Sequence, residues 1–268
     1  MQIGKKRFDT GQRTYIMGIL NVTPDSFSDG GCFEHLDAAL RHARDMVAEG
    51  ADILDVGGES TRPGHEQISV EEEIGRTVPV IEKLKQRFDV PVSIDTYKSQ
   101  VAEAALKAGA DLVNDIWGLK YDTQMADVIA RYHVPCCLMH NREKAEYHDL
   151  IPEVLEDLRE CIQLAKAAGI PDEQILLDPG IGFGKTYEMN LDILKNLSAL
   201  RSLNYPLLLG ASRKSVIGIT LDLPTGQREE GTLVTTVLGV QSGYSFVRVH
   251  DVKSTYRAIK MTEAIYKR

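Results

Sequence analysis

Apolar and polar positions alternate along this chain on the scale of whole secondary-structure elements. Short continuous apolar runs are bounded by glycine, proline or polar residues, and such runs are typical of strands that are buried on both faces. The pattern predicts eight strands of this kind. They are expected at residues 15–20, 52–56, 92–96, 112–116, 135–140, 175–178, 206–209 and 246–250.

Each expected strand is followed by a segment whose apolar residues have the three- and four-residue spacing of an amphipathic helix. Terminal signals support several of these helices. Ser69 with the acidic residues after it is typical of a helix start, and Gly50 and Gly109 suit helix ends. The helices are expected at residues 36–49, 70–87, 99–108, 123–132, 152–168, 190–200, 229–242 and 251–266.

Strands that alternate with helices indicate a parallel sheet. Eight such units in 268 residues favour an α/β fold, a closed (β/α)8 TIM barrel, because barrels of this type take roughly 250 residues. An open doubly wound sheet is the alternative. Without a linker or a break in composition, we expect one domain over 1–268, with the barrel over 15–268. Residues 1–14 are expected to form a short N-terminal hairpin or arm that turns at Asp9-Thr10-Gly11.

Composition and charge narrow the class of protein. The chain is 43% hydrophobic and has a net charge of −8, which argues against a nucleic-acid partner. No apolar run approaches the ~20 residues of a membrane span, and the polar residues 1–10 do not resemble a signal peptide. Cysteines 32, 136, 137 and 161 form no Cys-x-x-Cys pair. We therefore expect a cytoplasmic protein with no membrane partner.

The stretch 175–185 is rich in glycine and follows an apolar run that ends in Asp178. A phosphate-binding P-loop ending at Gly184-Lys185-Thr186 would need glycine at position 179, where the chain has Pro179. A dinucleotide fingerprint beginning at Gly180 would need glycine at position 185, which is a lysine. The stretch therefore gives no support for binding of ATP or NAD, and a structural strand-to-helix turn is one interpretation of it.

Polar residues follow most of the expected strands, and the carboxyl ends of barrel strands meet around one mouth. Each of these residues has a structural alternative, such as a helix cap, a core ion pair or a buried neutral histidine. Because all of them are expected at the same rim of the barrel, a binding site is favoured over these structural alternatives. Carboxylate and amide groups suited to a flat heterocycle come from Asp95, Asn114 and Asp178, and cations or donors suited to phosphate from Arg62, Lys214, Arg248 and His250.

Several motifs occur in the order that is found in one known family. They are Asn21-Val22-Thr23-Pro24-Asp25-Ser26-Phe27-Ser28-Asp29-Gly30-Gly31, Gly57-Gly58-Glu59-Ser60-Thr61-Arg62-Pro63-Gly64, Ile94-Asp95-Thr96, Asn114-Asp115-Ile116, Leu138-Met139-His140, Asp178-Pro179-Gly180-Ile181-Gly182-Phe183-Gly184-Lys185, Ser212-Arg213-Lys214 and Arg248-Val249-His250. With these motifs the chain resembles the dihydropteroate synthase family over residues 15–250. It departs from the family at Trp117-Gly118-Leu119, where a small, Gly/Ser-rich turn is common, and we interpret Trp117 as structural.

The resemblance implies a transferase of folate synthesis. This enzyme would join 6-hydroxymethyl-7,8-dihydropterin diphosphate to 4-aminobenzoate, release pyrophosphate and form 7,8-dihydropteroate. Loss of pyrophosphate would come first and leave a pterin cation, which the arylamine would then attack. The resemblance also implies inhibition by sulfonamides, which mimic 4-aminobenzoate, and a homodimer, for which the last two helices are candidates.

The resemblance further implies a role for each matching residue. Asp95, Asn114, Asp178 and Lys214 would bind the pterin edge, Arg248 would stack on its face, and Met139 and Phe183 would supply apolar walls. Asn21, Arg62 and His250 would hold the diphosphate, with Mg²⁺ bridging its oxygens and the Asn21 amide oxygen. Phe27, Thr61, Pro63 and Ser215 would contact 4-aminobenzoate. Asp29 would stabilise the cation and is grouped with Lys214 and Arg248 as catalytic.

Two other functions share part of this pattern. A corrinoid-type methyltetrahydrofolate methyltransferase would use the same pterin-binding residues but would need neither of the two long loops that follow the first two strands. A pterin-binding paralogue with a regulatory role would release no pyrophosphate. Cys32 near the first loop is interpreted as a bystander, because no histidine is placed by the sequence to activate it.

Overall fold

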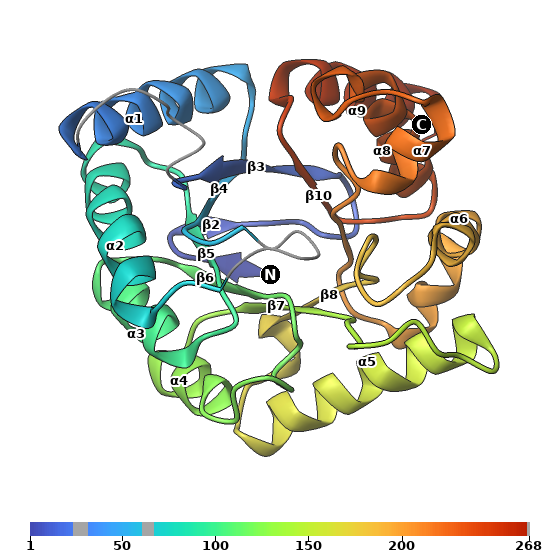
Figure 1. The fold of residues 1–268 in the computed structure, drawn as a ribbon, viewed down its shortest axis with the longest axis horizontal. Helices are drawn as coiled ribbons and strands as arrows, with labels where there is room; N and C mark the ends of the chain where they lie inside the picture. Colours follow the sequence, from blue (N-terminus) through green and yellow to red (C-terminus); the bar gives the residue numbers. More distant parts are fainter. Residues whose placement is uncertain (24–31, 61–66, 267–268) are drawn as a thin grey trace.

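The computed structural model describes residues 1–23, 32–60 and 67–266. Its main sheet has eight parallel strands in the order β8-β7-β6-β5-β4-β3-β10-β9. A further parallel bridge between Leu177 and Leu207 joins the two edges of this sheet, so it forms a barrel with the helices outside (Figure 1). The strands are β3 Tyr15–Asn21, β4 Ile53–Gly57, β5 Val92–Asp95, β6 Leu112–Asp115, β7 Cys136–Met139, β8 Ile175–Asp178, β9 Leu208–Leu209 and β10 Phe246–Val249. The TIM-barrel prediction is confirmed, and the open sheet is wrong.

The helices cover the outside of the barrel, and each barrel strand is followed along the chain by at least one of them. Three of them differ clearly from the expected pattern: α1 begins four residues earlier than expected, α7 was not expected, and α6 is shifted. α7 has seven residues with β-branched side chains among them, and is too short to show helical periodicity. α6 begins earlier than expected because Thr186 caps it, its hydroxyl accepting the Met189 N–H at 3.3 Å. The helices are α1 Cys32–Glu49, α2 Val70–Arg87, α3 Ser99–Lys107, α4 Met125–Tyr132, α5 Leu150–Ala167, α6 Tyr187–Lys195, α7 Ser215–Leu221, α8 Glu229–Gln241 and α9 Val252–Tyr266, with 3-10 turns η2 Asp172–Gln174, η3 Leu197–Leu203 and η4 Thr225–Gln227.

An antiparallel hairpin precedes the barrel, made of β1 Gln2–Ile3 and β2 Lys6–Arg7. The hairpin was expected, but its predicted turn at Asp9-Thr10-Gly11 is wrong. The strands reverse at residues 4 and 5, where Gly4 adopts a φ of 56° that other residues rarely accept. Asp9 instead begins a separate turn, in which its carbonyl accepts the Gln12 N–H at 3.2 Å.

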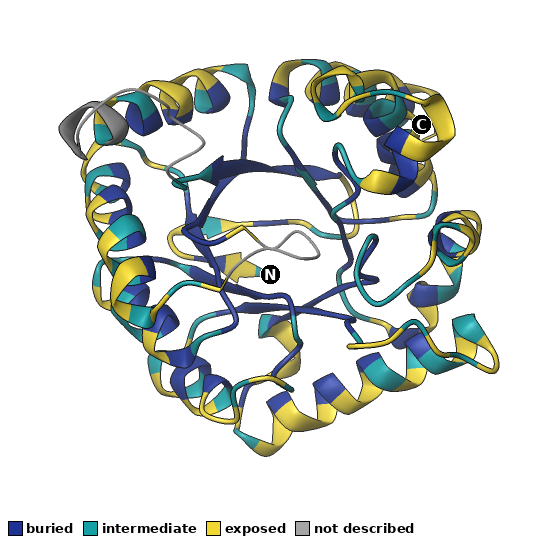
Figure 2. Cartoon of the chain, in the orientation of Figure 1, coloured by how far each residue is buried: buried dark blue, intermediate teal, exposed yellow. Residues whose placement is uncertain are grey.

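The hairpin closes the amino-terminal end of the barrel. Ile3 and Phe8 are buried in one apolar cluster with inward-facing strand residues, among them Tyr15 and Phe246. The strands of the barrel are mostly buried, whereas the helices are buried only along the stripe that faces the sheet (Figure 2). The amino-terminal half of the barrel interior is therefore a packed apolar core, and polar groups can gather only at the carboxyl-terminal mouth.

Hydropathy of the helices bears on the membrane question. Among residues 1–23, 32–60 and 67–266, no helix combines the length and the apolar character needed to cross a bilayer.

Candidate active site

The candidate functional groups lie inside the barrel, on the strands. They form the layer of inward-facing residues that follows the buried apolar layer toward the carboxyl ends of the strands. Because side chains of a strand alternate between its two faces, the residue two positions further on also faces the interior. On these strands, one inward-facing residue belongs to the apolar layer, and the inward-facing residue two positions later is a candidate functional residue. The pairs of apolar and functional residues are Ile53 with Asp55, Leu112 with Asn114, Cys137 with Met139, Leu176 with Asp178, and Phe246 with Arg248.

Strand register places four residues of neighbouring strands in one row. Asn21 pairs with Gly57, Gly57 with Asp95, and Asp95 with Asn114, across β3, β4, β5 and β6. A Cβ at Gly57 would lie 3.5 Å from Asn21 Oδ1 and 3.6 Å from Asp95 Oδ2. The side chains of Asn21 and Asp95, which are far apart in sequence, thus line the same space above a glycine.

Arg248 is the central cation of the site. Its Nε donates to Asp55 Oδ2 at 2.6 Å, and its Nη2 donates to Asp95 Oδ2 at 2.5 Å. Asn114 Nδ2 donates to the same Asp55 oxygen at 3.3 Å. Burial alone would lower the pKa of the guanidinium, but the carboxylates of Asp95 and Asp55 raise it, so Arg248 is charged. One partly buried cation therefore pairs with two buried carboxylates.

The carboxylates of the mouth keep acceptor capacity for a ligand. Burial raises the pKa of Asp95 to about 7, although Arg248 opposes the shift. Burial also raises the pKa of Asp178, against the Gly180 N–H that donates to its Oδ1 at 2.7 Å. Among the described residues, Oδ1 of Asp95 and Oδ1 of Asp55 are buried without a hydrogen-bond partner. Such oxygens suit the N–H groups of a heterocycle.

An apolar wall stands beside these polar groups. Met139, Tyr97 and Ile116 form a small buried cluster, against which Phe183 and Trp117 pack. Lys214 Nζ lies 4.0 Å from the centroid of the Phe183 ring, a distance that suits a cation–π contact. The structure therefore brings Met139, Phe183 and Lys214 together, as expected. It also places Trp117, interpreted from the sequence as structural, against this wall.

Two predicted residues lie at the rim rather than inside the mouth. His250 Nδ1 is 2.9 Å from Ser212 Oγ, and the side chain is half-buried. Ser215 is exposed at the first residue of α7. The predicted residues Phe27, Asp29, Thr61, Arg62 and Pro63 lie outside the described residues.

Asp55 is the functional residue that sequence reasoning missed. It is fully buried, and it binds both Arg248 and Asn114. A signal existed, because Asp55 is a carboxylate inside the otherwise apolar run Ile53–Gly57, at an inward-facing position. Asp52, three residues earlier and just before β4, is structural: its carboxylate accepts the Ile16 N–H at 3.0 Å.

The site offers oxygen donors to a metal ion only sparsely. Within the described ranges there is no group of three or more His, Cys, Asp or Glu residues that could hold a metal. The amide oxygen of Asn21 nevertheless borders the space above Gly57, beside an Asp95 oxygen. A neutral oxygen ligand at an open mouth fits Mg²⁺, which takes oxygen ligands and keeps several waters.

Comparison with known proteins extends the picture to the whole chain. The family described as pterin binding enzyme matches residues 17–250. A dihydropteroate synthase of Clostridium beijerinckii is 60% identical over 269 residues, which is 100% of both chains. A dihydropteroate synthase of Clostridium difficile, solved in the presence of pteroic acid, is similar with a TM-score of 0.96 and 54% identity, covering 98% of this chain and 100% of that one. A Yersinia pestis dihydropteroate synthase with a sulfonamide drug gives 0.94 and 42%, covering 100% and 99%.

Proposed function

The chain belongs to the dihydropteroate synthase family of pterin-binding enzymes, and from this premise we propose how its own residues bind and activate the substrates. The enzyme is a transferase that joins 6-hydroxymethyl-7,8-dihydropterin diphosphate to 4-aminobenzoate, with release of pyrophosphate, in folate synthesis. The observation that carries our proposal is the convergence of Asp95, Asn114, Asp178 and Arg248 on one mouth.

Pterin recognition is assigned to the inner part of the mouth. The carboxylates of Asp95 and Asp178 accept the amino and ring N–H groups of the pterin, and the Asn114 amide serves its other edge atoms. Arg248 covers one face of the ring, while Met139 and Phe183 form the apolar wall. The half-buried Lys214 adds a donor beside Phe183. A planar heterocycle with several donors matches this combination of acceptors and walls.

The diphosphate is assigned to the rim. Asn21 and His250 lie at the ends of β3 and β10, and Arg62 is assigned with them although it lies outside the described residues. Asn21 would hold a Mg²⁺ ion through its amide oxygen. When bound, this ion supplies positive charge to the oxygens of the departing pyrophosphate. The cations of the protein act in the same direction.

The reaction then needs no covalent nucleophile. The bond between the 6-methylene carbon and the diphosphate oxygen breaks, and pyrophosphate leaves with the electron pair. The resulting pterin cation is held by Asp95 and Asp178, and Asp29, which lies outside the described residues, is assigned as a further stabilising anion. The amine nitrogen of 4-aminobenzoate donates its lone pair to the methylene carbon and then loses a proton. Phe27, Thr61, Pro63 and Ser215 are assigned to the 4-aminobenzoate.

A pyrophosphate-release assay tests the proposal. With both substrates present, we expect stoichiometric release of pyrophosphate and formation of dihydropteroate, which neither the methyltransferase nor the non-catalytic alternative would give. Exhaustive treatment with EDTA should reduce turnover at least tenfold, because the leaving group then lacks its metal. Added Mg²⁺ should restore it. Full activity after removal of all divalent ions would eliminate Mg²⁺ as the cofactor.

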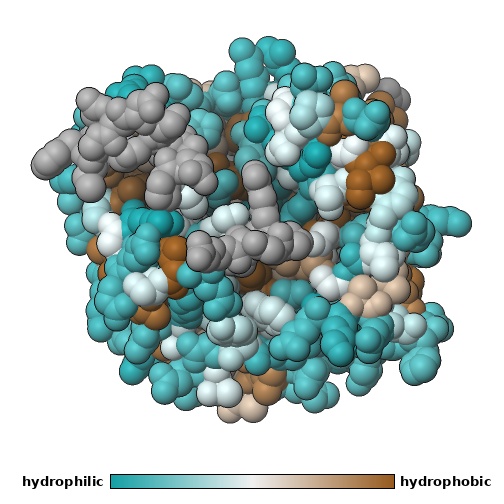
Figure 3. Space-filling model, viewed as in Figure 1, coloured by the Kyte–Doolittle hydropathy of each residue, from teal (hydrophilic) through white to brown (hydrophobic). Residues whose placement is uncertain are grey.

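We further propose that the chain forms a homodimer through α7, α8 and α9. Large apolar side chains are exposed on these helices: Ile219 is 60% exposed, Val234 59%, Met261 64% and Ile265 56%. Val234 and Leu238, as well as Met261 and Ile265, are four residues apart and therefore share a helix face. Exposed apolar side chains gather at this corner of the surface (Figure 3). An apolar patch of this kind supports an interface between copies.

The substitution Val234→Glu should weaken this dimer about 100-fold, because a carboxylate would be buried without a partner in an apolar contact. Sedimentation velocity across a dilution series would measure the change. Leu164→Glu on α5 is the matched control: Leu164 is 39% exposed, but α5 lies along the bottom of the barrel in Figure 1, separated from α7, α8 and α9 by α6. An unchanged dimer for Val234→Glu would reject the interface.

A cytoplasmic location is also proposed. It is supported by the free, buried state of Cys136, Cys137 and Cys161, which is typical of proteins in reducing compartments.

A further inference from the structure

Lys185 is a half-buried cation that the reaction described above does not use. It ends the glycine-rich loop that follows β8. Its Nζ lies 2.8 Å from His140 Nδ1, 3.0 Å from the Gly180 carbonyl oxygen and 3.0 Å from the Phe183 carbonyl oxygen. An ammonium group has three N–H donors, so these three acceptors use all of them. The loop is therefore folded around the lysine head group.

The loop itself depends on close contact with the segment after β7. Gly180 and Gly184 adopt positive φ angles of 69° and 54°. A Cβ at Gly180 would lie 1.9 Å from the His140 carbonyl oxygen, and one at Gly184 would lie 2.5 Å from the Arg142 carbonyl oxygen. Glycine lets the two backbones touch, but it also leaves the loop many alternative conformations. The lysine head group supplies the bonds that select one of them.

Both ends of this loop reach the pterin site. At its start, the Gly180 N–H donates to Asp178 Oδ1 at 2.7 Å, and the Gly180 carbonyl is one of the Lys185 partners. Further along, Phe183 packs against the Met139 cluster, and its carbonyl is another Lys185 partner. Loss of a hydrogen bond from the Lys185 ammonium would therefore shift the loop backbone next to Asp178 and next to Phe183.

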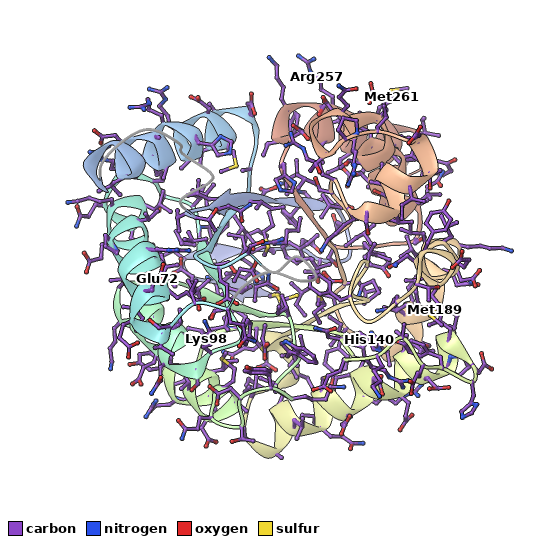
Figure 4. All side chains as sticks on the ribbon, in the orientation of Figure 1. Glu72, Lys98, His140, Met189, Arg257 and Met261 are labelled. Atoms are coloured by element: carbon purple, nitrogen blue, oxygen red, sulfur yellow. The ribbon has the colours of Figure 1, made fainter. Side chains whose placement is uncertain are left out.

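A second set of contacts, between His140 and residues near α5, orients the side chain of Lys185. His140 is fully buried, and its Nε2 lies 2.9 Å from Asp157 Oδ2 on α5 (Figure 4 labels His140 beside this helix). Burial lowers the pKa of His140 to about 4, so the imidazole is neutral at physiological pH. Nε2–H then donates to Asp157, which leaves Nδ1 as the acceptor for Lys185. The carboxylate also accepts Arg142 Nε at 2.7 Å, which fixes it in place.

We propose that Lys185 is a positioning residue for pterin binding: its ammonium, oriented by Asp157 through His140, holds the 179–184 loop so that Asp178 and Phe183 meet the pterin. The inference rests on the proposed pterin-binding roles of Asp178 and Phe183. Lys185 acts through the loop backbone and not by contact with the substrate.

The charges around Lys185 give this role a pH dependence. Burial lowers the pKa of Lys185 to about 7; Asp178 on β8 and Asp157 on α5 oppose the shift, while Arg142 and Lys214 favour it. A neutral amine keeps only two N–H donors, so one of its three acceptors loses its bond. The affinity for pterin should therefore fall as pH rises through the neutral range.

The remaining polar neighbour does not titrate in this range. The hydroxyl of Tyr147 donates to the Gly184 carbonyl at 2.8 Å, and burial raises its pKa to about 12.

Deprotonation of Lys185 should also affect folding stability, but its pH dependence should be opposite to that of the pterin affinity. In the unfolded chain a lysine has a pKa of about 10.4, so between about pH 7 and 10 the unfolded state binds more protons at this position than the folded state. The contribution of Lys185 to stability therefore rises with pH in the window in which pterin affinity falls. A lysine with only a structural role would change stability without this opposite change in affinity.

Lys185→Met tests the proposal, because methionine keeps an unbranched chain without donors. Calorimetry with 6-hydroxymethyl-7,8-dihydropterin diphosphate should show at least a tenfold loss of affinity at pH 6.5. The ratio of variant to wild-type dissociation constants should shrink toward pH 9, where the wild type also loses a bond; ionisation of the ligand cancels in this ratio. Lys144→Met, the same change at an exposed position, should match the wild type.

A pair of variants at His140 guards against failure of Lys185→Met to fold. Gln and Leu are similar in size, but only Gln keeps an acceptor for Lys185 Nζ. His140→Leu should weaken pterin binding more than fivefold relative to His140→Gln.

Wild-type affinity of folded Lys185→Met at pH 6.5, or an equal loss at every pH, would overturn the positioning role. Equal affinities of the two His140 variants would overturn it as well. If the wild type itself failed to bind the pterin diphosphate, the proposed function would fail instead.

Discussion

Asp178→Asn should lower the affinity for 6-hydroxymethyl-7,8-dihydropterin diphosphate roughly 100-fold, a loss of about 3 kcal/mol. Asp178 Oδ1 accepts the Gly180 N–H at 2.7 Å, so an asparagine must turn its oxygen toward that donor. Its NH₂ group would then face the N–H groups of the pterin. Two donors would meet in a buried place where a carboxylate and a donor met before.

Calorimetric titration without 4-aminobenzoate measures this loss. Asp89→Asn, the same change in an exposed loop between α2 and β5, is the matched control. Stability separates binding from folding. Burial raises the pKa of Asp178, so its stability contribution is present at low pH and is lost as pH rises through the folded pKa. Removing the charge should therefore not lower the free energy of unfolding at neutral pH. Unchanged pterin affinity would rule out the edge-binding role.

Arg248→Met should lower the free energy of unfolding by about 3–5 kcal/mol at neutral pH and abolish pterin binding. The guanidinium serves Asp55 and Asp95, which are 193 and 153 residues away in sequence. Without it, two carboxylates remain buried close to one another. Methionine preserves much of the packing volume, so the loss reports the missing charge.

The pH dependence of this variant has a defined sign. The pKa of Asp95 is raised to about 7, so the folded state binds more protons than the unfolded state between about pH 4 and 7, and stability falls as pH rises there. Arg248 lowers this pKa, so the variant should show the fall over a wider range and to higher pH. Urea unfolding at pH 5 and pH 8 measures the difference.

Two further variants make the test specific. Arg41→Met changes an exposed arginine of α1 and should leave stability nearly unchanged. Adding Asp95→Asn to Arg248→Met removes one of the two unpaired charges and should recover part of the loss. If the double variant were no more stable than Arg248→Met, the ion pair would not be the source of the effect.

The sequence predicted the barrel because its signals are local. A buried strand needs only a short apolar run, and a helix needs only apolar residues at a three- and four-residue spacing. α7 escaped this reasoning because seven residues hold too few repeats. The turn of the N-terminal hairpin was misplaced because Asp9-Thr10-Gly11 and residues 4–5 both suit turns, and only pairing between β1 and β2 selects the latter.

The same logic predicted most of the mouth. Asp95, Asn114 and Asp178 could be found because each is the last or the second-last residue of an apolar strand, and strand ends converge in a barrel. Asp55 was missed because it lies inside its strand rather than at the end; a carboxylate within an apolar run was the available signal, but the run does not show which groups Asp55 meets. Trp117 lacked a signal as well, since it packs against a cluster whose members, Tyr97, Ile116 and Met139, come from separate parts of the chain.

By itself, the sequence determined the repeating strand–helix units, the family resemblance and the residues delivered to one rim. Only the tertiary structure decided that Leu177 and Leu207 close the sheet, that Arg248 bridges Asp55 and Asp95, and that Lys185 sits in a cage of three acceptors. The physical reason is that periodicity and turn chemistry belong to neighbouring residues along the chain. Ion pairing and the pKa shifts caused by burial depend on groups that meet only when the strands are staggered and closed into a barrel.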